Sequence, residues 1–437
     1  MYQNVATLPV AVLGAGPVGL AAAAHLRERG MTPLVLEAGA LVGASLDSFR
    51  HVQLFSPWRY NVDKAARRLL EEAGWRMPAP DALPSAGELR DHYLAPLAAL
   101  PALADTLRLR HRVTAVTRAG SDKVTTRARA ETPFLIRAQT PDGPRDFLAS
   151  AVIDATGTWS QPNPLGANGI PALGETALAA RIAYGMPDVL GSQRPRYADK
   201  RVLVVGAGHS AAGTLLALAQ LAEEHPATRL AWATRSDRLA RVFGGGEADG
   251  LPARGALGRR LQALRDSGRL EMRQSFPIHA LEESDGRIAV YDTAGRRIDG
   301  IDEIVCATGA RPDLSVGREL RLRLDHWLES TDALAPLIDP NEHSCGTVRP
   351  HGHRELAHPE PGYYGVGAKS YGRAPNFLLA TGYEQVRSVV AALAGDLAAA
   401  DEVRLDLPET GVCNTRGALQ QAARPCCTVK AADATCC

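Results

Sequence analysis

The chain has 437 residues, of which 45% are hydrophobic and 22% are charged, and its formal net charge is +1. This composition is ordinary for a globular protein, and the length allows two to three domains. A near-zero net charge without basic runs gives no reason to expect nucleic-acid binding. No apolar stretch reaches the roughly 18 residues of a membrane span, and glycines interrupt the apolar start, so we expect a cytoplasmic protein with no membrane association.

The first informative pattern is a strand–loop–helix motif near the N-terminus. A short buried strand is expected over residues 9–13 and an alanine-rich helix over residues 20–29, with Gly14, Gly16 and Gly19 between them. The first glycine permits a tight turn, the second lets the backbone approach a diphosphate, and the third allows close helix–strand packing. Free N–H groups at the helix start would face the phosphates, so the motif predicts a dinucleotide site.

An acidic residue completes this motif. A second strand, expected over residues 32–36, ends at Glu37. Dinucleotide-binding folds place a carboxylate about 20 residues after the first glycine, where it accepts hydrogen bonds from a ribose diol. We therefore expect Glu37 to bind ribose.

A second glycine motif begins at residue 201. A strand is expected over residues 201–205 and a helix over 212–223, and the loop between them contains Gly206, Gly208 and a small third residue, Ala211. His209 and Ser210 are adjacent in this loop. Neighbouring side chains in such a turn diverge, so we interpret them as loop residues and not as a catalytic Ser–His pair.

The second motif differs from the first at its ribose end. The next strand, over residues 230–234, ends in Thr234 and is followed by Arg235, with no carboxylate. An arginine can pair with the 2′-phosphate of adenosine, whereas an acid would repel it, so the sequence favours NADPH over NADH. The alternative is that Arg235 is a solvated surface side chain.

Two Ala-Thr-Gly segments follow the glycine motifs. The first, at 155–157, continues through Trp159, Pro162, Pro164 and Gly166, and the second lies at 307–309. With the paired glycine motifs, this arrangement resembles flavin-containing monooxygenases and the wider pyridine nucleotide-disulfide oxidoreductase superfamily over roughly residues 8–395.

The resemblance implies an α/β protein with two Rossmann-like domains, in which an NADPH-binding domain is inserted into an FAD-binding domain. The expected boundaries are 1–170 and 310–400 for the FAD domain, 171–309 for the NADPH domain, and 401–437 for a flexible cysteine-rich tail. It assigns FAD to Gly14, Gly16, Gly19 and Glu37, and NADPH to Gly206, Gly208, Ser210 and Arg235. The other cofactor-binding candidates are Pro17, Thr156, Gly157, Thr234, Thr308, Gly309 and Gly382.

The segment 364–385 matches the family's return element, where a loop and a helix N-terminus meet the flavin. In the same family the chain after the ribose acid passes the flavin ring, which would place Trp58 and Arg50 nearby. We take Trp58, Lys369 and Tyr371 as candidates near the reacting ring, although Trp58 could equally be a packing residue.

Two departures from the superfamily bear on the reaction. The histidine-containing stretch that monooxygenases carry before the second motif has no counterpart, because no histidine occurs between residues 181 and 200. The oxygen-dependent step therefore lacks this feature of the family. No Cys-x-x-Cys pair follows the first motif either, so the flavin-proximal disulfide of thioredoxin and glutathione reductases is missing.

The C-terminus concentrates the cysteines. Five of the seven lie in the tail, and they are Cys413, Cys426, Cys427, Cys436 and Cys437. Vicinal thiols can chelate thiophilic ions such as As(III), Hg(II) or Cu(I), or exchange disulfides, and the alternative is a dispensable tail.

A further cluster contains His343, Cys345, His351, His353 and His358. Its spacing fits no zinc frame, so we expect surface loop histidines there.

The return element and the tail together resemble flavin monooxygenase-like proteins encoded with bacterial arsenic-resistance genes. The resemblance implies an NADPH-dependent FAD monooxygenase that uses oxygen to oxidise a soft nucleophile such as a trivalent arsenical, and it allows a homodimer. The first alternative is an NADPH-dependent metal or disulfide reductase that uses the tail cysteine pairs. The second is a non-catalytic, flavin-bearing metalloid-binding protein.

Overall fold

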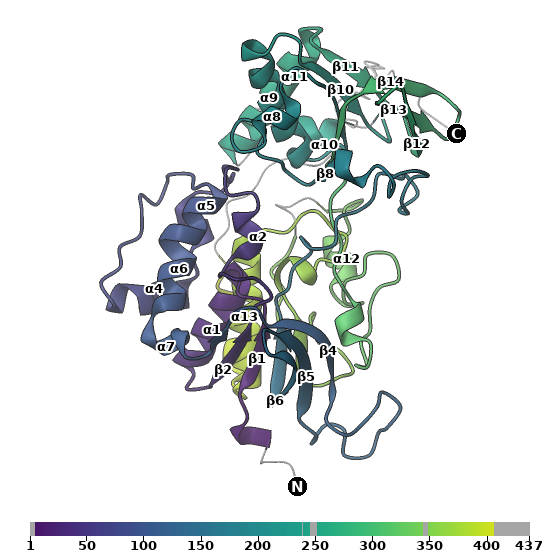
Figure 1. Ribbon diagram of the computed structural model, residues 1–437. Coiled ribbons are helices and arrows are strands. Elements are labelled where there is room, and N and C mark those ends of the chain that lie inside the picture. The colour runs from purple at the N-terminus through teal and green to yellow at the C-terminus, as the bar shows by residue number, and fades with distance from the viewer. Residues whose placement is uncertain (1–4, 238, 245–250, 344–347, 406–437) are drawn as a thin grey trace, which may run out of the picture.

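The computed structural model describes residues 5–237, 239–244, 251–343 and 348–405 (Figure 1). Two five-stranded parallel sheets, each with its own helices, form two bodies that lie one above the other in Figure 1, and each has a small antiparallel sheet beside it. This confirms the predicted α/β class with two Rossmann-like units. Among the described residues, no helix has the length and apolar composition needed to cross a membrane.

The first sheet is built from chain segments far apart in sequence. Its strand order is β16-β7-β1-β2-β3, and every neighbouring pair is parallel. The strands are β1 (Val10–Leu13), β2 (Pro33–Leu36), β3 (Leu107–Arg108), β7 (Ala151–Asp154) and β16 (Tyr363–Gly365). All residues of β1 and β7 are buried, as expected for the middle of a sheet covered on both faces.

Helices α1 (Pro17–Glu28) and α13 (Leu379–Leu393) pack against each other beside this sheet. The segment between β2 and β3 forms a helical layer at one side of the body in Figure 1. Its elements are α2 (Ala44–Asp47), α3 (Trp58–Asn61), α4 (Lys64–Glu72), α5 (Ala86–Leu89), a π-helical turn (Arg90–Leu94), α6 (Ala95–Ala99) and α7 (Pro101–Ala104). After β15 the chain adds α12 (Ala335–Ile338), and after α13 it ends in α14 (Leu397–Asp401).

The second sheet has the order β11-β10-β9-β15-β8 and is also parallel throughout. Its strands are β8 (Ile182–Tyr184), β9 (Arg201–Val205), β10 (Arg229–Ala233), β11 (Leu270–Arg273) and β15 (Glu303–Cys306). Its helices are α8 (Arg194–Tyr197), α9 (His209–Glu224), α10 (Ala240–Phe243) and α11 (Pro252–Asp266). Trp232 is fully buried on β10, and its indole donates to the Gly206 carbonyl at 2.7 Å, which fixes the loop after β9.

Each body carries a three-stranded antiparallel meander. The first contains β4 (Arg112–Arg118), β5 (Phe134–Thr140) and β6 (Gly143–Ala149), and the second contains β12 (Ile278–Ser284), β13 (Arg287–Asp292) and β14 (Arg297–Ile301). Along β5, buried and more exposed residues alternate, which is typical of a sheet with one face on a core.

Both glycine-motif helices begin earlier than the sequence predicts. Helix α1 starts at Pro17 instead of residue 20, and α9 starts at His209 instead of residue 212. Proline is favourable at the first helical position because its missing N–H would have no partner there. The third glycine of the first motif, Gly19, therefore lies inside α1, where a Cβ atom would approach the Gly14 carbonyl oxygen to 1.9 Å.

Two connections join the bodies, and they bond to each other. Pro162 and Ala310 form an antiparallel bridge. The Asn163 amide donates to the Gly309 carbonyl at 2.9 Å, and its side-chain amide donates to the Thr308 carbonyl at 3.1 Å. The two connections therefore form one short hydrogen-bonded ribbon.

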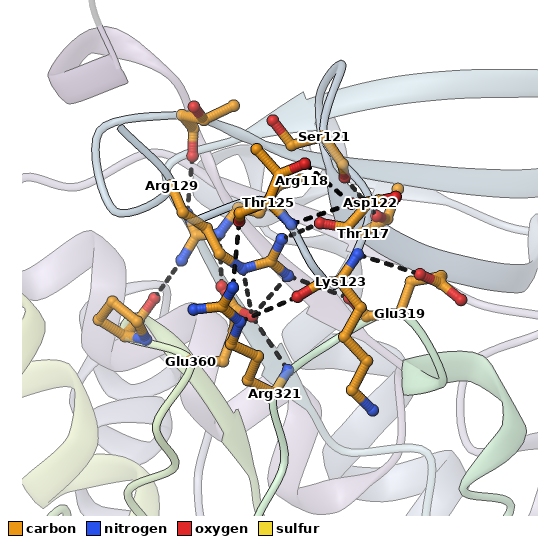
Figure 2. A network of polar contacts seen from close by, with 12 residues as sticks. Thr117, Arg118, Ser121, Asp122, Lys123, Thr125, Arg129, Glu319, Arg321 and Glu360 are labelled. Atoms are coloured by element: carbon orange, nitrogen blue, oxygen red, sulfur yellow. Dashed lines mark hydrogen bonds and ion pairs between the residues drawn. The ribbon is translucent and has the colours of Figure 1, made fainter. Parts of the chain in front are cut away.

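A buried ion network attaches the β4–β5 loop to the later part of the chain (Figure 2). The Glu360 carboxylate accepts from Arg118 Nε at 2.7 Å and from Arg129 Nη2 at 2.7 Å. It also accepts from the Arg321 backbone N–H at 3.0 Å. All three charged side chains of this core are at most 5% exposed. The loop is thus fixed by charge pairing in place of apolar packing.

We expect Glu360→Gln to lower the free energy of unfolding by about 3–5 kcal/mol, because it leaves two buried guanidinium groups without a counter-charge. Urea denaturation checks this. The control is Arg137→Met, which removes an exposed pair with Asp146 and should cost at most about 1 kcal/mol. Equal effects of the two substitutions would contradict the interpretation.

Candidate functional site

The first glycine loop is shaped by close backbone approach. Gly14 has φ +92°, and a Cβ atom there would lie 3.0 Å from the Ala155 carbonyl oxygen. A Cβ atom at Gly16, by contrast, would meet nothing within 4 Å. Gly16 also caps α1 and has no side chain to occupy the first-turn N–H groups. The loop thus leaves an open approach to the positive end of α1.

Glu37 lies at the end of β2 and is 8% exposed. Its two carboxylate oxygens accept backbone N–H groups at 2.6 Å, one from Ala15 in the glycine loop and one from Gly39. The acid therefore bridges the glycine loop and the turn after β2. Its predicted role as a ribose acceptor is untested.

The first turns of helices α1 and α13 lie side by side. A Cβ atom at Gly367 would lie 3.2 Å from Val18 Cγ2, and one at Gly382 would lie 2.7 Å from the same atom. Val18 is in the first turn of α1, and Gly382 is in the first turn of α13, whose cap is the apolar Leu378. Two positive helix ends and an open glycine loop therefore converge, and this arrangement fits the diphosphate and ring system of a flavin dinucleotide.

Lys369 forms a buried ion pair. Its ammonium nitrogen lies 2.6 Å from Asp154 Oδ2 and also donates to Thr156 Oγ1 at 3.1 Å and to the Asp313 carbonyl at 2.9 Å. Asp154 is fully buried and accepts as well from the Tyr363 hydroxyl at 2.9 Å. Burial alone would raise the pKa of the Asp154 carboxyl, but Lys369 lowers it, so the pair is ionic.

Lys369 and Tyr371, predicted to lie near the flavin, are both buried, and their role in the reaction remains a prediction. Tyr371 packs on His351, with ring centroids 5.6 Å apart. Gln385, fully buried on α13, accepts from the Gly367 N–H at 2.7 Å and donates to Ser370 Oγ at 2.9 Å. Gln385 thereby fixes the loop between β16 and α13.

Trp58, the third candidate near the ring, is 4% exposed in the apolar core at the start of α3. Arg50 is exposed and pairs with Asp47 and Asp91. No motif pointed to Asn61, which is 1% exposed and whose backbone carbonyl accepts from the Tyr383 hydroxyl of α13 at 2.7 Å.

The second glycine loop repeats the geometry of the first. Gly206 has φ +129°, and a Cβ atom there would lie 2.2 Å from the Ala307 carbonyl oxygen, whereas one at Gly208 would meet nothing within 4 Å. Gly208 caps α9, and Ser210 is half-buried in the first turn. The start of α9 is therefore open to a phosphate in the same way as the start of α1.

Arg235 lies just beyond the end of β10 and is exposed. Its Nη1 donates to the Ala167 carbonyl at 3.3 Å, and Thr234 is buried with its hydroxyl donating to the Ser236 carbonyl at 2.8 Å. In the connections, Thr308 Oγ1 donates to the Asn163 carbonyl at 2.9 Å, while Gly157 and Gly309 have φ of +68° and +87°. The predicted cofactor role of each remains untested.

The expectation of surface histidines is wrong for His351, which is 5% exposed. Its Nδ1 is 2.9 Å from the Arg349 carbonyl, and its Nε2 is 3.0 Å from Gln385 Nε2, so the ring is a neutral acceptor toward Gln385. His358 Nδ1 accepts from the Arg323 N–H at 3.2 Å. Spacing alone could not show these separate partners.

No cluster of three possible metal ligands occurs among the described residues. The tail cysteines Cys413, Cys426, Cys427, Cys436 and Cys437, and also Cys345, lie outside the described residues. The predicted tail metal site therefore remains a prediction.

Comparison with known proteins supports the fold. A sequence model of the NAD(P)-binding Rossmann-like domain family matches residues 12–77. The chain matches no curated protein sequence. A structure of bacillithiol disulfide reductase from Bacillus cereus is similar, with a TM-score of 0.64 and 17% identity over 89% of this chain and 99% of that chain.

Two oxygenase structures have the same fold. A variant of the flavin monooxygenase from Stenotrophomonas maltophilia has a TM-score of 0.57 and 23% identity over 89% of this chain and 98% of that chain. An ornithine N-hydroxylase from Kutzneria sp. 744, with reduced FAD, NADP⁺ and L-ornithine, has a TM-score of 0.58 and 18% identity, covering 90% and 98%. At these identities, reductases and oxygenases share one architecture with this chain.

We expect Lys369→Met to lower the free energy of unfolding by about 3–5 kcal/mol, because it leaves the Asp154 carboxylate buried and unpaired. Asp154→Asn combined with Lys369→Met should recover much of that loss. Urea denaturation of both single variants and the double variant gives the coupling energy directly. Additive losses would show that the two side chains do not interact.

We expect the free energy of unfolding to fall as the pH drops below about 6.5. Burial lowers the pKa of His351, and it lowers that of His358 to about 4, so the unfolded chain binds more protons in this window. Each histidine contributes a slope of up to about 1.4 kcal/mol per pH unit. Urea denaturation from pH 7.5 to 5 should show a smaller slope for His351→Gln. An unchanged slope would rule out His351.

Proposed function

We propose that this protein is an NADPH-dependent FAD oxidoreductase that uses oxygen to oxidise a soft nucleophile such as a trivalent arsenical. The observation that carries the redox assignment is the presence of two glycine loops with the same geometry. In each loop the first glycine packs against a backbone carbonyl, and the second leaves open space before the start of a helix. One loop alone would support only a nucleotide-binding protein. Two loops in one chain support the meeting of two dinucleotides.

The first body would hold FAD. Gly14 makes the tight turn, Gly16 leaves room for the diphosphate, and Glu37 stands at the end of β2 where a ribose would lie. The start of α13 would face the ring end, where its positive dipole favours negative charge. When bound, FAD would accept a hydride and react with oxygen, while the protein supplies orientation and shields the site.

The second body would hold NADPH. The start of α9 is open to the diphosphate, and the exposed guanidinium of Arg235 follows β10, where a 2′-phosphate would lie. Its bond to the Ala167 carbonyl is long enough, at 3.3 Å, to be exchanged for a charge-assisted bond to phosphate.

The overall reaction balances as an oxygenation. NADPH and one proton supply two electrons, one oxygen atom goes to the nucleophile, and the other leaves as water. For an arsenical, As(III) becomes As(V) as the new As–O bond forms. The choice of an arsenical rests on the resemblance of residues 364–385 and of the cysteine-paired tail.

The reductase alternative depends on the tail. The one cysteine in the described ranges, Cys306, is buried, its pKa is raised by burial to about 11, and its sulfur lies 3.2 Å from Thr308 Oγ1. A thiol with so high a pKa is a poor nucleophile near neutral pH. A reductase would therefore have to use the tail thiols.

Three measurements on the full chain distinguish these functions. The oxygenase predicts NADPH oxidation and oxygen consumption that both rise with added arsenite, and arsenate as the product. NADPH turnover that continues without oxygen and stops on truncation at residue 410 would replace it with the reductase. Arsenite binding without NADPH consumption under any condition would replace it with a metalloid-binding protein.

We expect Arg235→Ala to raise the KM for NADPH about tenfold while changing the KM for NADH less than threefold, because it removes a charge-assisted bond to the 2′-phosphate. Steady-state kinetics with both nucleotides check this. The control is Arg229→Ala, whose exposed side chain lies at the opposite end of β10 and should alter neither value. A parallel change for NADPH and NADH would remove Arg235 from phosphate recognition.

A further inference from the structure

An aromatic contact crosses between the two bodies at the second glycine loop. The Phe55 ring meets the His209 imidazole edge-on, with ring centroids 5.3 Å apart and planes at 65°. Edge-on aromatic pairs at such distances are attractive. His209 is the first residue of α9, directly after Gly208. The first body therefore touches the second at the point where the diphosphate of a nicotinamide dinucleotide would bind.

The backbone on both sides of Phe55 is pinned. Before it, Gln53 forms an antiparallel bridge with Ser85, and the Leu54 N–H donates to the Pro84 carbonyl at 2.8 Å. After it, the Asn61 side-chain amide donates to the Ser56 carbonyl at 2.6 Å. Held at both ends, the half-buried Phe55 has little freedom to follow the second body if that body moves.

The same support leads to α13. Asn61 donates again, to the Pro57 carbonyl at 3.1 Å, and its own carbonyl accepts from the Tyr383 hydroxyl at 2.7 Å. Tyr383 is buried in the second turn of α13, the helix whose start would face the flavin ring. A short run of hydrogen bonds therefore connects the flavin end of the first body to the ring that touches His209.

A second aromatic contact lies alongside. Phe49 packs on Trp159 of the first connection, with centroids 4.6 Å apart, and the Trp159 ring fills the space beside Gly185, where a Cβ atom would come within 2.9 Å. Gly185 directly follows β8 of the second body. The segment 49–55 thus presents one aromatic ring to the connection and another to the glycine loop.

We propose that Phe55 is a positioning residue that holds the second glycine loop in register with the flavin end of the first body through its contact with His209. This inference rests on the proposed function. A rigidly supported ring fixes where α9 begins relative to α13, and it thereby fixes how far the two dinucleotides stand apart. Small misplacements of reacting groups slow a transfer step much more than they weaken binding.

The test uses Phe55→Ala in the full chain loaded with FAD. We expect the anaerobic rate of flavin bleaching at saturating NADPH to fall about tenfold, while the Kd values for FAD and NADP⁺ stay within about threefold of wild type. Amide hydrogen exchange in residues 212–215, whose N–H groups are the first of α9 to bond within the helix, should speed up about tenfold even without nucleotide. Phe55→Tyr, which retains the ring, should restore both values.

The matched control is Phe147→Ala. Phe147 packs on His111 with centroids 5.8 Å apart, so this variant removes a comparable pair on β6 of the first meander. The proposal would be overturned if Phe55→Ala kept the wild-type rates of amide exchange and flavin bleaching. It would also be overturned if Phe147→Ala changed both rates as much as Phe55→Ala does. A wild-type protein that binds neither FAD nor NADP⁺ would instead contradict the proposed function. The two failures are therefore distinguishable.

Discussion

The buried pair of Asp154 and Lys369 is the contact on which the first body depends. Asp154 ends β7, before the second body begins in the chain, and Lys369 follows β16, after that body is complete. The same ammonium also binds the Asp313 carbonyl of the returning connection. An ion pair removed from water is costly unless every partner is present, so this one forms only when all three segments meet.

That requirement determines the architecture of the candidate site. Within the described part of the chain, β16 is an edge strand that pairs with β7 alone. The Tyr363 hydroxyl reaches Asp154 from β16, and the Lys369 ammonium reaches it from the turn after that strand. Once that strand is in place, the loop after it carries Gly367 against Val18, and α13 begins beside α1. The starts of α1 and α13, which fit a dinucleotide, thus converge because the ion pair of Asp154 and Lys369 holds β16 and the loop after it in place.

The sequence predicted best those features in which a local backbone geometry requires a particular residue type, such as the glycines of a tight turn. The strands that flank the two glycine motifs and the loops themselves follow from short-range steric rules, and the structure places them close to the expected bounds. Glu37 lies at the end of β2, and its role stays a prediction. Side-chain partners were not predictable in this way, because they come from segments far apart in sequence. The partner of Lys369, Asp154, lies 215 positions away in the sequence, and its predicted place near the ring stays a prediction. His351 was expected in a surface loop, but it is buried against Gln385.

The link between the two bodies is narrow. Their two covalent connections bond to each other through Asn163, so they run side by side as one narrow ribbon. A ribbon of this kind restrains translation better than rotation, so orientation must come from contacts elsewhere. The rings of Phe49 and Phe55 supply such contacts, one at the connection and one at the start of α9. The aromatic contacts and the hydrogen bonds behind them therefore contribute to the relative placement of the two glycine loops, together with the sheets that carry the loops.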